Sequence, residues 1–234
     1  MEEKTVKNEF DLDVEAMTEA GLQFGHRTSK VNPKMRPYFS GVRSGIHIID
    51  LEQTLVKFAE ALRFIQKLIT ENKVLLIVGT KIQAGDLVKE VAKECGLPYV
   101  SERWIGGTFT NFETILKRTT SFKDLENKKA TGELEKYTKK ERAQFDKKIQ
   151  DMETKFGGIK NLTKLPDAIF VLDMKKDAAA VKEARAKGVK VIGIAHTNVD
   201  PTLADFAIPA NDDSVPSVKY ILEKTKEAIL KVRP

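Results

Sequence analysis

Short apolar runs alternate with helix-length segments through most of this sequence, and this order restricts the fold more than any other feature. The run Lys73–Gly79 (KVLLIVG) is typical of a strand buried on both faces, and Thr80–Glu94 follows it with helical spacing. Asp167–Asp173, a helix over Lys175–Lys187 and the run Lys190–Ala195 repeat the order. Such repeats predict an α/β fold in which helices cover both faces of a parallel sheet.

The remaining elements fit the same scheme. Further strands are predicted at Ile46–Asp50, Tyr99-Val100 and Phe206–Pro209, and further helices from Asp50 to Glu71 and over Ser214–Val232. Helix starts are expected where a capping residue precedes Gln or Glu by three positions. Four such pairs occur: Asp50 and Gln53, Thr80 and Gln83, Thr110 and Glu113, and Thr138 and Glu141.

Residues 111–157 interrupt the alternation. They carry no strand signal, and their apolar side chains follow a helical spacing of three and four residues in two sets. The sets are Phe112, Ile115, Thr119 and Phe122, and then Phe145, Ile149, Met152 and Phe156. Two narrow stripes joined by a charged turn predict an antiparallel coiled-coil hairpin. We therefore predict a core domain of residues 1–108 and 158–234 with an insertion of residues 109–157; the alternative is that these helices simply pack on the core.

Charge is distributed unevenly along the chain. The net charge is +6, yet residues 21–49 contain five cations and no acid. Within this stretch, residues 21–45 form a basic arm that Pro33 and Pro37 should hold in an extended conformation. Its cations could neutralise phosphates and its aromatic side chains could stack on unpaired bases. The alternative is a plain basic loop, which the absence of every acid from the stretch disfavours. The cations are Arg27, Lys30, Lys34, Arg36 and Arg43.

Common signatures of catalysis are missing from the sequence. It contains no Walker phosphate loop, no HExxH zinc helix, no GxSxG nucleophile elbow and no GxGxxG fingerprint. The single cysteine, Cys95, excludes a disulfide framework and is best interpreted as a packed apolar side chain. Gly79-Thr80-Lys81 lies where a strand meets a helix and could hold a phosphate. A nucleotide-binding Rossmann-like enzyme therefore stands as the alternative function, and a protein scaffold as a third.

Polar side chains gather in the loops that follow the last predicted strands. They are His196, Asn198, Asp200, Asp205, Asp212 and Asp213. Ligands of parallel sheets collect at the carboxyl ends of strands, so a divalent ion is conceivable there, held with help from His26. The candidate ligands are His26, His196 and Asp212; solvated acids and helix caps are the commoner explanation.

Nine short motifs, in order, resemble one family. The chain is similar to the bacterial small-subunit ribosomal protein S2 family from about Met17 to about Tyr220. The motifs are FGHRT from Phe24, NPKM from Asn32, GIHIID from Gly45, VGTK from Val78, RWIGGT from Arg103, TNF from Thr110, GGIK from Gly157, LPDA from Leu165 and NDD from Asn211.

The resemblance implies a flavodoxin-like sheet with an inserted coiled-coil hairpin. It also implies a non-catalytic protein located in the cytoplasm, in the ribosome. Its partners would be 16S rRNA and other small-subunit proteins, including the mRNA-binding protein S1, with neither membrane nor DNA among them. The chain departs from the family pattern at His196-Thr197-Asn198, where Asp-Thr-Asn is frequent.

The expected RNA contacts combine the basic arm with three further residues. Lys81 would reach a phosphate from the start of a helix, and Arg103 and Trp104 would act at the base of the hairpin. Trp104 could stack on a base or lie in the core. No cofactor is expected apart from the divalent ion considered above.

Overall fold

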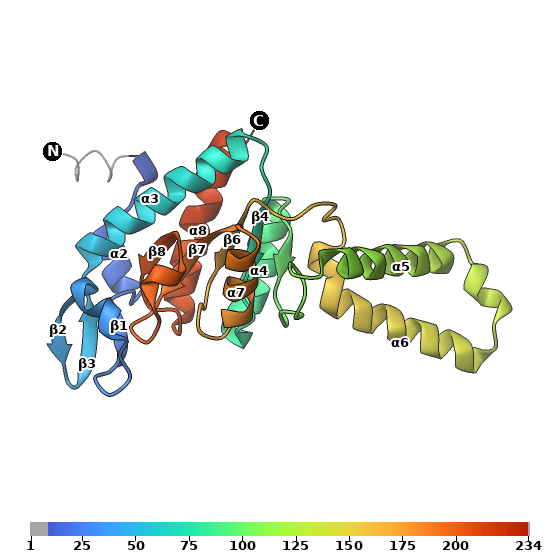
Figure 1. The fold of residues 1–234 in the computed structure, drawn as a ribbon, viewed down its shortest axis with the longest axis horizontal. Helices are drawn as coiled ribbons and strands as arrows, with labels where there is room; N and C mark the ends of the chain where they lie inside the picture. The colour runs from blue at the N-terminus through green and yellow to red at the C-terminus, as the bar shows by residue number, and fades with distance from the viewer. Residues whose placement is uncertain (1–8, 234) are drawn as a thin grey trace.

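A five-stranded parallel sheet forms the centre of the computed structural model, which describes residues 9–233 (Figure 1). Its strands lie in the order β5-β4-β6-β7-β8, and every neighbouring pair is parallel. The predicted α/β fold class is therefore confirmed. The strands are β4 (Leu75–Val78), β5 (Tyr99–Val100), β6 (Ala168–Val171), β7 (Lys190–Ala195) and β8 (Phe206–Pro209).

Helices cover both faces of this sheet because its central strands are apolar throughout. Leu75 and Ile77 point toward a core shared with α3 (Leu51–Thr70), α4 (Ile82–Glu94) and α8 (Val215–Val232). Leu76 and Val78 belong to the second core, which α7 (Ala178–Ala186) completes together with side chains from the base of the hairpin. Successive strand residues alternate between faces, so each strand supplies both cores.

The basic arm is not the extended segment that we predicted. It folds into β1 (Phe24–Arg27), the short 3-10 helix η1 (Pro33–Tyr38) and β2 (Phe39–Arg43). These strands flank β3 (Ile46–Ile49) in a separate antiparallel sheet of order β1-β3-β2. The β2–β3 turn has φ of 52° at Ser44 and 75° at Gly45, which suits a two-residue hairpin. Pro33 lies at the first turn of η1, where a missing N–H donor costs nothing, and Pro37 lies inside the same short helix.

Two long helices project from the opposite end of the molecule (Figure 1). They are α5 (Phe112–Ala130) and α6 (Lys139–Phe156), and the 3-10 helix η2 (Glu133–Lys136) lies in the connection between them. Lys129 Nζ on α5 lies 2.6 Å from Asp146 Oδ1 on α6. The least exposed side chains of α6 are Phe145, Ile149, Met152 and Phe156, the stripe identified from the sequence.

Other elements complete the description and correct several expected helix starts. The helix α2 (Val14–Glu19) precedes the basic arm, and the 3-10 helices η3 (Gly157–Ile159) and η4 (Pro201–Leu203) follow α6 and β7. The Thr138–Glu141 capping box is confirmed. At α3 the N-cap is Asp50, but Gln53 bonds its side chain rather than its backbone N–H.

Two expected capping boxes are wrong. Lys81, not Thr80, is the N-cap of α4, because Thr80 Oγ1 donates to Asp177 Oδ1 instead. Asn111, not Thr110, is the N-cap of α5, because Thr110 bonds Glu183.

Across residues 9–233 no helix is long and apolar enough to span a membrane.

Candidate functional site

The five cations of the basic arm all lie on the surface. Lys34 Nζ makes a 2.6 Å ion pair with Asp200 Oδ2 and also donates to Thr202. Within residues 9–233, the remaining four make no ion pair, so their charges face solvent. Those four are Arg27, Lys30, Arg36 and Arg43. An open positive face is what binding to a polyanion requires.

Hydrogen bonds fix the basic arm against the ends of two parallel strands. His26 N–H donates to Thr197 Oγ1 at 2.9 Å, and Asn32 N–H donates to the Thr197 carbonyl at 2.9 Å. At Gly25 the backbones approach so closely that a Cβ would lie 2.6 Å from Thr197 Cγ2 and 2.7 Å from the His47 carbonyl oxygen. The arm is thus positioned by the loop after β7, and glycine is required at the contact.

Arg103 and Trp104 lie on the other side of the molecule. They precede α5 and follow the edge strand β5, whereas the arm contacts the loop after β7. Arg103 is exposed and lines a cavity of about 490 Å³, together with Arg118 and Lys155. Trp104 is buried, packs edge-on against Phe109 and donates its indole N–H at 3.2 Å to Glu183 Oε1. The core interpretation of Trp104 therefore fits its surroundings, and it is not available for stacking on a base.

Lys81 is held inside the protein by three carboxylates. Its Nζ lies 2.8 Å from oxygens of Asp173, Asp212 and Asp213. Burial alone would lower the pKa of Lys81, but attraction to Asp212 and hydrogen bonds to all three carboxylates raise it. Burial and repulsion from Asp173 raise the pKa of Asp212 to about 7. Lys81 is paired internally, so it is not part of the exposed basic face.

This cluster also occupies the place where a nucleotide would bind. The strand order reverses between β4 and β6, and ligands of such sheets bind beyond the carboxyl ends at that point. Lys81 follows β4 and Asp173 follows β6. Thr80 N–H donates to Asp177 Oδ2, and a Cβ on Gly79 would meet Leu172 at 2.7 Å. The carboxylates would repel a phosphate, and Gly79 is explained by close packing.

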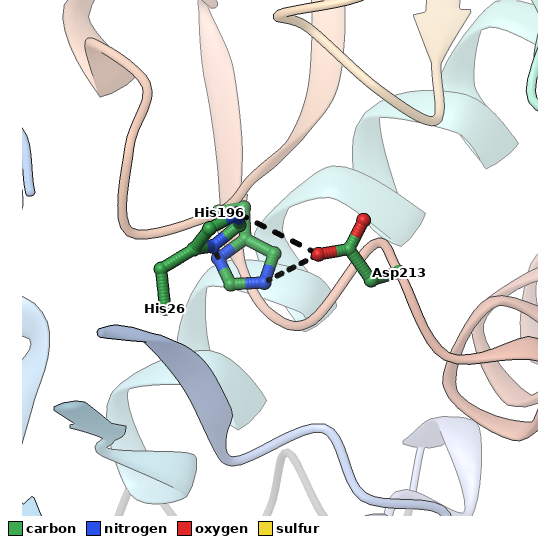
Figure 2. Close-up of side chains that lie close together, drawn as sticks. All are labelled: His26, His196 and Asp213. Atoms are coloured by element: carbon green, nitrogen blue, oxygen red, sulfur yellow. Dashed lines mark hydrogen bonds and ion pairs between the residues drawn. The ribbon is translucent and has the colours of Figure 1, made fainter. Parts of the chain in front are cut away.

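Two histidines meet beyond the ends of β7 and β8 (Figure 2). His26 on β1 and His196 after β7 place their Nδ1 atoms 2.9 Å apart, with the rings edge to face. Asp213 Oδ2 lies 3.6 Å from His26 Nε2 and 3.7 Å from His196 Nε2. The structure thus joins two of the three candidate metal ligands. The third member of the cluster is Asp213 and not the predicted Asp212, whose Oδ1 faces Lys81.

Sequence reasoning overlooked Asp173 and Glu183. Asp173 directly follows a buried apolar run, which is the signal that places a side chain at the carboxyl edge of a parallel sheet. Glu183 lies on α7 and accepts hydrogen bonds from the loop before α5. Nothing in its own neighbourhood of the sequence marks that role.

The fold and the site define a Rossmann-like α/β protein whose nucleotide position is filled by internal ion pairs and whose separate antiparallel sheet carries exposed cations. Comparison with known proteins gives the family. A family model described as "Ribosomal protein S2" matches residues 17–232. The "Small ribosomal subunit protein uS2" of Roseiflexus sp. (strain RS-1) is 43% identical over 219 residues, covering 94% of this chain and 84% of that protein.

The chain belongs to the ribosomal protein S2 family. It is a structural protein of the small ribosomal subunit, is located in the ribosome in the cytoplasm and is not an enzyme. Its partners are accordingly ribosomal RNA and other ribosomal proteins.

Proposed function

We propose that the exposed cations of the basic arm bind phosphates of 16S rRNA. The most direct support is that these cations lack internal partners. Four of the five make no ion pair within residues 9–233, although 34 acids are present in the chain. Cations that lack internal partners keep their full attraction for a polyanion. Lys34 contributes more weakly because Asp200 already neutralises it.

The rigid anchoring of the arm supports the same proposal. Thr197 is fully buried and bonds both His26 and Asn32, so the arm meets RNA as a folded sheet rather than a flexible tail. Preorganised cations lose less conformational entropy on binding. Arg103 is exposed near the opposite edge of the parallel sheet, so a second, separate phosphate contact is proposed there.

The test is the salt dependence of binding to transcribed 16S rRNA. The test variant has Arg27, Lys30, Arg36 and Arg43 changed to alanine. For this variant, the slope of log K against log salt should be shallower by about 0.7–0.9 for each lost phosphate contact, or about 3 in total. The matched control removes four exposed lysines of the core that likewise make no ion pair within residues 9–233: Lys93→Ala, Lys182→Ala, Lys187→Ala and Lys231→Ala. Equal slopes for the two variants contradict the proposal.

We also propose, on the family resemblance alone, that this protein supports docking of the mRNA-binding protein S1 on the small subunit. Subunits reconstituted with the chain should retain more S1 through sedimentation than subunits assembled without it. Equal retention of S1 in the two preparations contradicts this part of the proposal and leaves the RNA contacts untouched.

A further inference from the structure

We propose that the cavity at the base of the hairpin holds an unpaired nucleotide of RNA. The cavity has a volume of about 490 Å³ and lies where the two helices of the hairpin join the rest of the molecule (Figure 1). Its walls come from the loop after β5, the second turn of α5 and the last turn of α6. The inference rests on the phosphate contact proposed for Arg103 and adds what that site recognises.

Three cations line this cavity and keep their charges free. They are Arg103, Arg118 and Lys155, all exposed, and none makes an ion pair or a side-chain hydrogen bond within residues 9–233. Glu102, the acid in the lining, is already paired with Lys89 at 2.6 Å. The cavity therefore keeps an excess of positive charge, which attracts the phosphates on either side of a nucleotide.

The size and the walls of the cavity suit one nucleotide better than a double helix. Pockets for small ligands have volumes of about 300–1,000 Å³, and this cavity falls in that range. An RNA duplex is far wider, whereas an unpaired base can leave its strand and enter a pocket. Inside the charged rim, Trp104, Ile105 and Phe156 form an apolar wall. Trp104 is too buried to stack, so the base would pack beside it.

Glu102 gives the cavity a means of selecting the base. Its Oε1 accepts from Lys89, while its Oε2 makes no hydrogen bond within residues 9–233. A carboxylate oxygen accepts a hydrogen bond from the exocyclic amino group of cytosine. Uracil carries a carbonyl oxygen at the same ring position, and that oxygen is repelled by the carboxylate. The cavity should therefore prefer cytosine to uracil.

Hydrogen bonds and an ion pair hold the walls of the cavity in place. Glu183 accepts from the Trp104 indole N–H at 3.2 Å and from Gly107 N–H at 2.8 Å, so the middle of the loop is held from both sides. Lys160 Nζ, just after η3, lies 3.2 Å from Glu126 Oε1 on α5. A preformed cavity has fewer groups to order on binding, which favours affinity.

An acidic peptide is the other occupant that these charges would attract. Peptides commonly bind by adding a strand to an exposed sheet edge, and β5 is the edge strand that leads into this cavity. However, η3 lies against that edge, so closely that a Cβ on Gly158 would collide with the Tyr99 carbonyl oxygen. A further strand cannot pair with β5 at this position, and the observations favour a nucleotide.

The test follows the fluorescence of Trp104, the single tryptophan of the chain and part of the cavity wall. Titration of the full-length protein with oligo(C) of about ten nucleotides should change this fluorescence, and oligo(U) should bind about tenfold more weakly. Glu102→Ala should bring the two affinities to within about twofold of each other. Arg118→Ala combined with Lys155→Ala should make the slope of log K against log salt shallower by about 1.4.

The matched controls lie away from the cavity. Lys182→Ala combined with Lys187→Ala removes two exposed lysines of the core and should leave the salt slope for oligo(C) unchanged. Glu90→Ala removes an exposed acid of α4 and should leave the preference for oligo(C) at about tenfold. Both controls alter charge by the same amount as the variants with which they are compared.

Three results would overturn the proposal. The first is unchanged Trp104 fluorescence at saturating oligo(C), because any bound RNA would then lie elsewhere. The second is equal affinity of the wild type for oligo(C) and oligo(U). The third is displacement of oligo(C) by an equal concentration of hexaglutamate, which would assign the cavity to an acidic protein segment. Binding of Arg103→Ala to 16S rRNA is measured separately, and an unchanged salt slope there would instead refute the phosphate contact on which this inference rests.

Discussion

Replacing Glu183 with glutamine should loosen the loop from which the hairpin projects. The Glu183 carboxylate accepts five hydrogen bonds from this loop. Oε1 accepts from Trp104 Nε1 at 3.2 Å and from Gly107 N at 2.8 Å. Oε2 accepts from Phe109 N at 2.9 Å and from the backbone and hydroxyl of Thr110 at 3.2 and 3.3 Å. One side chain therefore satisfies donors across four residues of the loop.

The magnitude follows from what glutamine can still accept. Its amide keeps one oxygen and turns an NH₂ group toward the other set of donors, so at least two bonds to a charged acceptor are lost. Such bonds contribute about 1.5–3 kcal/mol each. Glu183 is only partly buried, so water replaces part of this. We expect Glu183→Gln to lower the free energy of unfolding by about 2–4 kcal/mol.

The same carboxylate should make stability depend on pH. Burial alone would raise the pKa of Glu183, but hydrogen bonds from Phe109, Gly107, Trp104 and Thr110 lower it below the ordinary 4.5. A lowered folded-state pKa stabilises the protein fully above the unfolded value and progressively less as pH falls through the folded value. Between pH 7 and acid conditions below about pH 4.5, the wild type should therefore lose more stability than Glu183→Gln.

Urea unfolding is the assay, followed by circular dichroism and by the fluorescence of Trp104, the single tryptophan of the chain. Glu90→Gln is the matched control, because Glu90 is an exposed glutamate on α4 with no ion pair among residues 9–233. Its unfolding free energy should change by less than about 0.5 kcal/mol. If Glu183→Gln is equally mild, the hydrogen bonds do not hold the loop and the reasoning is refuted.

Two further predictions concern the hairpin. Thr138→Ala removes the capping box of α6, which should cost about 1 kcal/mol locally and speed amide exchange at residues 139–142. Thr120→Ala on α5 is its control, and unchanged exchange in Thr138→Ala would count against the cap. Replacing residues 112–156 by a glycine–serine linker should leave a core that unfolds cooperatively, because the parallel sheet and its helices lie outside that segment. Its stability should be lower than that of the whole chain, because Ile115, Phe122 and Phe156 are lost from the second core. A broad, non-cooperative thermal transition of the truncated chain would show that the hairpin is part of the core.

Local patterns were sufficient to predict most elements of the sheet. The runs at Lys190–Ala195 and Phe206–Pro209 are strands with the expected bounds, because apolar residues in sequence favour a strand buried on both faces. The helix predicted over Ser214–Val232 begins at Val215, with Ser214 as its N-cap. Hydrophobic periodicity and helix capping depend on residues a few positions apart, so they can be recognised directly in the sequence.

Predictions failed where a distant partner competed for a local group. Thr80 and Thr110 have the spacing of caps, yet Asp177 and Glu183 bond them instead. Lys81 has the position of a phosphate ligand, yet carboxylates from two other loops surround it. The basic arm was expected to be extended because of Pro33 and Pro37, yet both prolines lie in η1 and the strands of the arm pair with β3. Each error arose from a contact spanning many residues of chain.

The amino-acid sequence by itself determined the alternating α/β order, the helical interruption and the acid-free stretch, since these depend on neighbouring side chains. Only the tertiary structure decided which charges are free. It paired Lys81 internally, left Arg27 and Arg43 exposed, and brought His26 within 2.9 Å of a histidine 170 residues away. The physical reason is that electrostatic and ligand geometry depends on distance in space, which strand order and loop packing set.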